Sequence, residues 1–167
     1  QLVIPNLSMK VLSRNNKKIG ILKIRSFMPN STCKDALQLI RANKLQTLLI
    51  DLRDNGGGQV DQVKCVAGIF LGKSAIFNEY SSEKKGQETQ EKMPERYFGK
   101  LAVLMNAATA SASEILALAL VDNNRAILLG ERSYGKGSII QGQKIDKNYS
   151  LKGIIGFFTS PKTNYSH

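Results

Sequence analysis

Apolar residues recur along the chain with two different periods. Alternating or continuous apolar runs are typical of half-buried and fully buried strands, and they predict strands at 19–25, 47–52, 101–105, 126–129, 138–145 and 153–158. Apolar residues at helical spacing predict helices at 33–42, 60–71 and 111–121. Because buried strands alternate with helices, the pattern predicts a single layered α/β domain over residues 1–167.

Two segments lack a clear period. Residues 1–18 are interpreted as an N-terminal lead-in to the first predicted strand. Residues 81–98 contain a polar, weakly periodic run (SSEKKGQETQEKMPER), which is interpreted as an exposed loop within the domain rather than a linker between domains.

Length and charge narrow the class of protein. The 167 residues suffice for one domain with a substantial core, and the formal net charge is +11. Lys and Arg are scattered and aromatic residues do not interleave with them, so the charge predicts a basic surface without specific nucleic-acid binding. No apolar run approaches the roughly 18 residues of a membrane span. The chain begins with Gln and has no basic-then-apolar leader, as expected of a processed or excised piece.

The scarcity of histidine limits the chemistry further. The only histidine is His167, the last residue, and terminal residues are usually too poorly ordered to serve as a general base or metal ligand. Ser-His-Asp and Cys-His catalysis are therefore disfavoured, and we expect no cofactor and no metal. Cys33 and Cys65 have no metal-ligand spacing, and buried free thiols are the preferred interpretation over a disulfide.

The segment around Ser111 allows a structural and a catalytic interpretation. Ser111 lies between a predicted buried strand and an apolar helix, with Ala110 and Ala112 on either side. At a helix start, free N–H groups favour a developing oxyanion, and the Ala112 N–H is the natural donor. Ser111 and Glu114 also match a capping box, so a purely structural cap remains open.

The segment around Lys136 nearly matches a phosphate-binding loop. Residues 130–138 (GERSYGKGS) contain the required Gly and Lys spacing, but Gly137 replaces the Ser or Thr and a strand follows instead of a helix. Nucleotide binding is therefore disfavoured, and the simplest alternative is a solvent-exposed lysine at a turn.

Glycines follow the predicted buried strand at 47–52. In the segment 51–58 (DLRDNGGG), Gly57 and Gly58 can present a backbone N–H to a ligand, although a tight turn explains them equally well. Asp51 and Asp54 suggest a cation site, but no further carboxylate follows at ligand spacing.

Together these three segments resemble the carboxyl-terminal processing peptidases, also called tail-specific proteases. The motifs DLRDNGGG, TASASEI and ERSYGKGS occur in the family's order, and the similarity runs from about Ile19 to Pro161. The resemblance implies a crotonase-like α/β core of repeated ββα units and a serine endopeptidase that cleaves near protein C-termini through an acyl-enzyme. It also implies extended polypeptide tails as substrates and an extracytoplasmic location such as the bacterial periplasm.

The resemblance assigns roles to individual positions. It places the nucleophile at Ser111 and the general base at Lys136, 25 residues later, with Asp122 in a supporting position. It implies an oxyanion hole formed by Ala112 with Gly57 and Gly58. The family's substrate-reading PDZ domain is not expected within this chain, so the chain is interpreted as the catalytic core.

One position departs from the family pattern. A glutamine commonly occurs four residues after the lysine, but that position is Ile140 here and the glutamine is Gln141. Because a shift of one residue on a strand turns the side chain to the opposite face, Gln141 replaces it only if a bulge intervenes.

The proposed chemistry makes a demand on its lysine. A general base must be neutral, so we expect Lys136 to be largely buried, with neither Glu114 nor Glu131 held against its amine. The alternative function is a catalytically weak or inactive peptide-binding module with the same groove.

Overall fold

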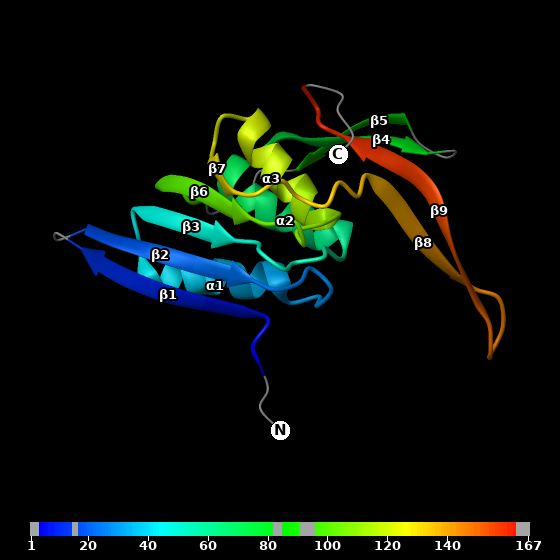
Figure 1. The fold of residues 1–167 in the computed structure, drawn as a ribbon, viewed down its shortest axis with the longest axis horizontal. Helices are drawn as coiled ribbons and strands as arrows, with labels where there is room; N and C mark the ends of the chain where they lie inside the picture. The colour runs from blue at the N-terminus through cyan, green and yellow to red at the C-terminus, as the bar shows by residue number, and fades with distance from the viewer. Residues whose placement is uncertain (1–3, 15–16, 82–84, 91–95, 163–167) are drawn as a thin grey trace.

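A computed structural model describes residues 4–14, 17–81, 85–90 and 96–162. A five-stranded sheet forms the larger layer (Figure 1). Its strands, in spatial order, are β1 (Leu7–Arg14), β2 (Lys17–Ile24), β3 (Thr47–Asp51), β6 (Lys100–Met105) and β7 (Ile127–Gly130). β1 pairs antiparallel with β2, and the pairs from β2 to β7 are parallel. All four parallel strands therefore end at the same edge of the sheet.

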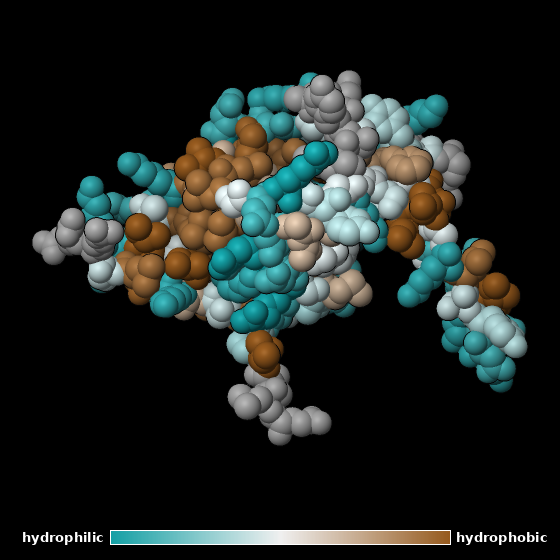
Figure 2. Space-filling view, in the orientation of Figure 1, coloured by the Kyte–Doolittle hydropathy of each residue, from teal (hydrophilic) through white to brown (hydrophobic). Residues whose placement is uncertain are grey.

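A four-stranded antiparallel sheet forms the second layer. Its order is β5 (Lys85–Gln90), β4 (Ser74–Ser81), β9 (Ser150–Thr159) and β8 (Ser138–Lys144). β8 and β9 form a hairpin that extends away from the rest of the domain (Figure 1). Apolar residues are exposed along this hairpin and on β7, as Figure 2 shows.

The described residues contain three helices, which pack on one another and on the sheets. They are α1 (Thr32–Asn43), α2 (Val60–Leu71) and α3 (Ala112–Asp122). α2 and α3 pack on each other and contact β4, while α1 packs on α2. Their apolar side chains and those of β2, β3 and β6 form one core, with Phe27, Phe70 and Leu116 fully buried. The predicted layered α/β class is confirmed.

The sequence did not predict three of the described strands, which are β1, β4 and β5. The interpreted lead-in 1–18 includes all of β1, which pairs with β2 along its full length. The interpretation of 81–98 as an exposed loop is wrong for its described residues, because β5 pairs with β4 and both Glu88 and Tyr97 are buried. Lys64 of α2 forms an ion pair with Glu88 at 2.7 Å. Residues 82–84 and 91–95 lie outside the described residues.

The preferred interpretation of the cysteines was also wrong. Cys33 and Cys65 form a disulfide with their Cα atoms 5.8 Å apart. It joins the first turn of α1 to the middle of α2, elements that the chain separates by β3 and the glycine loop. Sequence spacing could not reveal this pair because the contact depends on how the two helices pack.

Among the described residues, no helix is long and apolar enough to cross a membrane.

Candidate active site

Ser111 occupies a sharp turn between β6 and α3. Its φ of 56° and ψ of −122° fall in a region that residues with a side chain rarely adopt. Such strain persists only where surrounding contacts impose it, and it is concentrated at functional sites. The turn brings Ser111 to the wall of a cavity at the carboxyl-end edge of the parallel strands.

Glu114 ties this turn to the segment that carries Lys136. Its carboxylate is buried and accepts hydrogen bonds from three backbone N–H groups. Oε2 accepts from Ser111 at 2.6 Å and from Lys136 at 2.9 Å, and Oε1 accepts from Gly135 at 2.7 Å. Charge-assisted bonds of this kind compensate the burial of a carboxylate. The capping interaction is therefore present, and it also joins the two sequence motifs.

Lys136 lines the same cavity as Ser111 and is half-buried, less than the sequence led us to expect. Within the described chain its amine forms no ion pair with a carboxylate, because Glu114 contacts the Lys136 backbone and Glu131 is exposed. The Lys136 segment is fixed on both sides. The Tyr134 N–H donates to the Thr109 carbonyl at 2.9 Å, and the Phe158 N–H donates to the Gly137 carbonyl at 2.8 Å.

The glycine loop lies directly against the Ser111 turn. A Cβ atom on Gly57 would come within 2.9 Å of both the Ser111 Cβ and the Ala112 nitrogen, so only glycine fits. Fully buried Asn55 holds the loop, because its Oδ1 accepts the Gly57 N–H at 2.9 Å and its carbonyl accepts the Ala110 N–H at 3.0 Å. The backbone N–H groups of Gly58 and Ala112 donate to no acceptor in the described chain. Ala112 follows Ser111 in the chain, and Gly58 lines the same cavity as Ser111.

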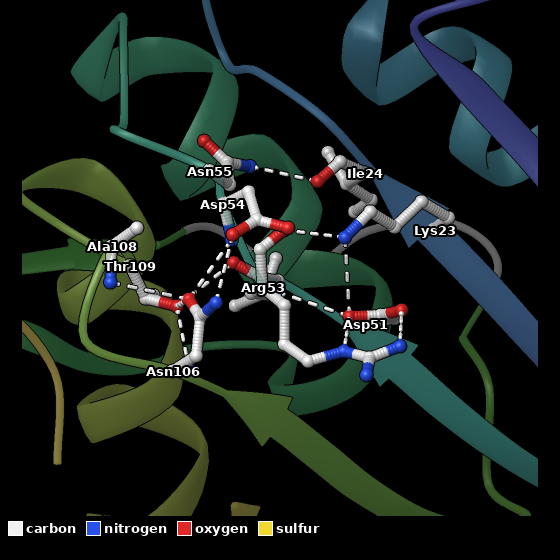
Figure 3. A network of polar contacts seen from close by, with 10 residues as sticks. Lys23, Ile24, Asp51, Arg53, Asp54, Asn55, Asn106, Ala108 and Thr109 are labelled. Carbon is white, nitrogen blue, oxygen red and sulfur yellow. Dashed lines mark hydrogen bonds and ion pairs between the residues drawn. The ribbon is translucent and has the colours of Figure 1, made fainter. Parts of the chain in front are cut away.

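Further polar contacts join the ends of β3 and β6 (Figure 3). Asp54 and Asn106 bond reciprocally, through Asp54 N–H to Asn106 Oδ1 at 3.0 Å and Asn106 Nδ2 to Asp54 Oδ1 at 2.8 Å. Thr109 Oγ1 donates to the Leu52 carbonyl at 2.9 Å. These bonds fix the loop that leads into Ser111.

Asp51, considered above as a cation ligand, is instead paired within the protein. Arg53 contacts it through two nitrogens, at 3.0 and 2.8 Å, and Lys23 lies 3.3 Å away (Figure 3). Burial alone would raise the pKa of Asp51, but the hydrogen bonds from Arg53 and the charge of Lys23 outweigh it and lower that pKa.

The cavity itself has a volume of about 570 Å³. Ser111, Lys136, Gly57 and Gly58 line it together, so the structure brings these four predicted residues to one place. Its remaining wall is mainly apolar and includes Met28, Val60, Phe77, Ile115, Ile139 and Phe158. No carboxylate is among the described residues that line it.

Gln141 and Asp122 are not brought to this cavity. Gln141 is exposed on β8, whereas the preceding Ile140 lines the cavity. The bulge in this hairpin leaves Ile155 of β9 unpaired, so it does not change the face of Gln141 on β8. Asp122 ends α3, roughly 16 Å along the helix from Ser111, and its carboxylate accepts a hydrogen bond from the buried Ser160 hydroxyl.

Sequence reasoning missed two residues that organise the site. The sequence indicates only a turn at Asn55. The signal for its role as a cap of the glycine loop is that a polar residue stands between a buried strand and three glycines. Glu114 was considered as a helix cap, but its bonds to Gly135 and Lys136 depend on tertiary structure. His167 lies outside the described residues.

Comparisons with known proteins identify the family of the chain. The profile of "Peptidase family S41" matches residues 18–167. The chain is 40% identical over 153 residues to the chloroplastic carboxyl-terminal-processing peptidase 2 of Arabidopsis thaliana, covering 88% of this chain and 29% of that protein. It is 31% identical over 140 residues to the tail-specific protease of Haemophilus influenzae, covering 82% of this chain and 20% of that protein.

The fold is likewise shared with a solved structure. A photosystem II D1 C-terminal processing protease superposes with a TM-score of 0.81 at 24% identity, covering 96% of this chain and 45% of that chain. The chain thus has the fold of a peptidase of known structure. The chain belongs to peptidase family S41, and it spans less than a third of the length of these two curated relatives.

Proposed function

We propose that the chain is the catalytic core of a serine endopeptidase in which Ser111 is the nucleophile and Lys136 the general base. The observation that carries the proposal is that both residues line one cavity and are held together by Glu114. In the described chain no histidine is available to move the proton, and Lys136 is a basic side chain in the wall that Ser111 shares.

The reaction proceeds through an acyl-enzyme. Neutral Lys136 accepts the Ser111 hydroxyl proton as Oγ attacks the scissile carbonyl, and the resulting ammonium protonates the leaving amine. Water then attacks the acyl-serine, with the same lysine as base. A substrate that fills the cavity would exclude water from the half-buried Lys136 and from Ser111 beside it in the wall.

The oxyanion hole is formed by the N–H groups of Gly58 and Ala112. Ala112 follows Ser111 in the chain, Gly58 lines the same cavity as Ser111, and neither N–H group is used within the described chain. Gly57 contributes differently, because its own N–H is bonded to Asn55 and its missing side chain allows the loop to approach. Removing one such donor typically costs about 10²–10³ in kcat.

Asp122 is proposed to support activity indirectly. Through Ser160 it anchors the end of β9, and the neighbouring Phe158 bonds the Gly137 carbonyl next to Lys136. Gln141 is exposed and has no proposed role in orienting the lysine.

Polypeptide tails are the proposed substrates, and an extracytoplasmic compartment is the proposed location. The apolar cavity wall fits the side chains of an extended peptide. The Cys33–Cys65 disulfide supports an oxidising compartment.

A fluorophosphonate probe tests the proposed nucleophile. Covalent labelling at Ser111, abolished in Ser111→Ala and slowed at least 100-fold in Lys136→Met, is expected, while labelling of a Ser113→Ala control persists. Peptide binding without any labelling would favour the non-catalytic peptide-binding module and reject the enzyme. Melting temperatures of all variants show whether a loss reflects unfolding.

A further inference from the structure

A second lysine faces the proposed catalytic cavity. Lys152 of β9 is among the residues that line it, together with Ile140 of β8. None of the three sequence motifs contains Lys152, which reaches the cavity through the β8–β9 hairpin.

The strand register explains why Lys152, and not Gln141, faces the cavity. Ile140 pairs with Ile154 and Gly142 pairs with Lys152, so these residues share one face of the hairpin. Gln141 pairs with Gly153 and is turned to the opposite face. A Cβ atom on Gly142 would lie 3.5 Å from Lys152 Cγ, an ordinary van der Waals contact, so Lys152 packs across this position of β8.

The Lys152 charge has no partner within the described chain. No carboxylate forms an ion pair with it, and the described lining residues of the cavity include no acid. Lys152 is an exposed residue at the rim of a mainly apolar cavity, and it has no counter-ion within the described chain. A group of opposite charge on a bound peptide would supply one.

Cavity size limits where that group lies on the peptide. A sphere of about 570 Å³ is roughly 10 Å across, which is about three residues of extended chain. Lys152 and Ser111 line the same cavity. A carboxylate that reaches Lys152 is therefore within about three residues of the bond at Ser111.

Building on the proposed peptidase function, we propose that Lys152 is a specificity residue that binds a carboxylate of the substrate close to the scissile bond. Two sources share this chemistry: the α-carboxylate of a short tail and the side chain of Asp or Glu. The Lys152 ammonium acts as a point charge, so it can bind a carboxylate from either source, and the experiment below distinguishes the two sources.

Binding is measured in the Ser111→Ala background, so that the result does not depend on catalysis. Fluorescent hexapeptides with an Ala-Leu-Val centre are prepared in three versions: with a free C-terminal carboxylate, with a C-terminal amide, and with an amide plus one Glu two residues after the leucine. Fluorescence anisotropy gives the three Kd values. We expect one carboxylate version to bind about 10-fold tighter than the plain amide, and that version identifies the source.

Charge variants of the hairpin decide the role of Lys152. Lys152→Gln is expected to remove the 10-fold preference for a carboxylate. Lys152→Glu is expected to reverse it, so that a peptide carrying Lys in place of Glu binds more tightly than the Glu peptide. Lys147→Gln is the matched control, because it removes one charge from the same hairpin outside the cavity wall, and the preference should survive.

Four results would overturn the proposal. Two concern the peptides: equal affinity for all three of them, or no binding to any of them. Two concern the variants: a carboxylate preference that survives Lys152→Gln, or an equal loss of that preference in Lys147→Gln. Failure of the peptidase function appears separately, as absent fluorophosphonate labelling of Ser111 in the unmodified chain.

Discussion

At the scale of single residues, the site depends on one carboxylate that takes no direct part in the chemistry. Glu114 accepts three N–H groups from the two segments that carry Ser111 and Lys136. In Glu114→Gln an amide NH₂ must face at least one of these donors, and an unsatisfied buried group costs about 1–3 kcal/mol. We expect the rate of fluorophosphonate labelling at Ser111 to fall about 10- to 100-fold.

The matched control is Glu131→Gln, which removes a carboxylate that is exposed in the neighbouring loop. Its labelling rate should stay within a factor of two of the unmodified chain. Rates measured well below both melting temperatures separate misplacement of the proposed Ser111–Lys136 pair from unfolding. An unchanged rate in Glu114→Gln would show that other contacts hold the two segments together.

Only those residues of the site that belong to local sequence motifs could be predicted from the sequence. Ser111, Lys136, Gly57 and Gly58 belong to recognisable local patterns, and the structure places all four around one cavity. The three bonds of Glu114 and the position of Lys152 depend on how loops and strands meet, which leaves no local signal.

At the scale of elements, the ends of the parallel strands are held by ionic contacts as well as by the sheet. Asp51 ends β3 and is bonded by Arg53 and Lys23 (Figure 3). The lowered pKa of Asp51 means that its contribution to stability is complete above its unfolded value of about 3.9 and is lost as pH falls through the lower folded value. Asp51→Asn lacks this contribution at every pH.

We therefore expect Asp51→Asn to be about 2 kcal/mol less stable than the unmodified chain at pH 6, and the difference to shrink as pH falls below about 4. Urea unfolding at pH 6, 4 and 3 measures it. Asp61→Asn, at an exposed position of α2, should show a smaller and flatter difference. A constant gap across the three pH values would contradict the ionic explanation.

Elements were predicted well where their own sequence determines them. The predicted helix 60–71 matches α2 because its apolar residues face one core. β5 escaped prediction because its sequence, KGQETQ, has no apolar alternation: it forms through pairing with β4 and through the Lys64–Glu88 ion pair. Strand formation of this kind comes from neighbours and not from the strand itself.

At the scale of the whole molecule, the Cys33–Cys65 disulfide connects the two helices next to the glycine loop. The cysteines are 32 residues apart, and closing a loop of that length restricts the unfolded chain by roughly 3–4 kcal/mol. For a domain of this size, each kcal/mol corresponds to about 2–4 °C in melting temperature. Reduction is therefore expected to lower the melting temperature by roughly 10 °C.

Differential scanning calorimetry with and without a phosphine reductant measures this shift. The double variant Cys33→Ser/Cys65→Ser should melt near the reduced chain and show no response to reductant, which separates the disulfide from other effects of the reagent. Thiol titration of the denatured, unreduced chain should find no free thiol. Two free thiols together with an unchanged melting temperature would mean that packing of α1 on α2, and not the covalent bond, holds this side of the site.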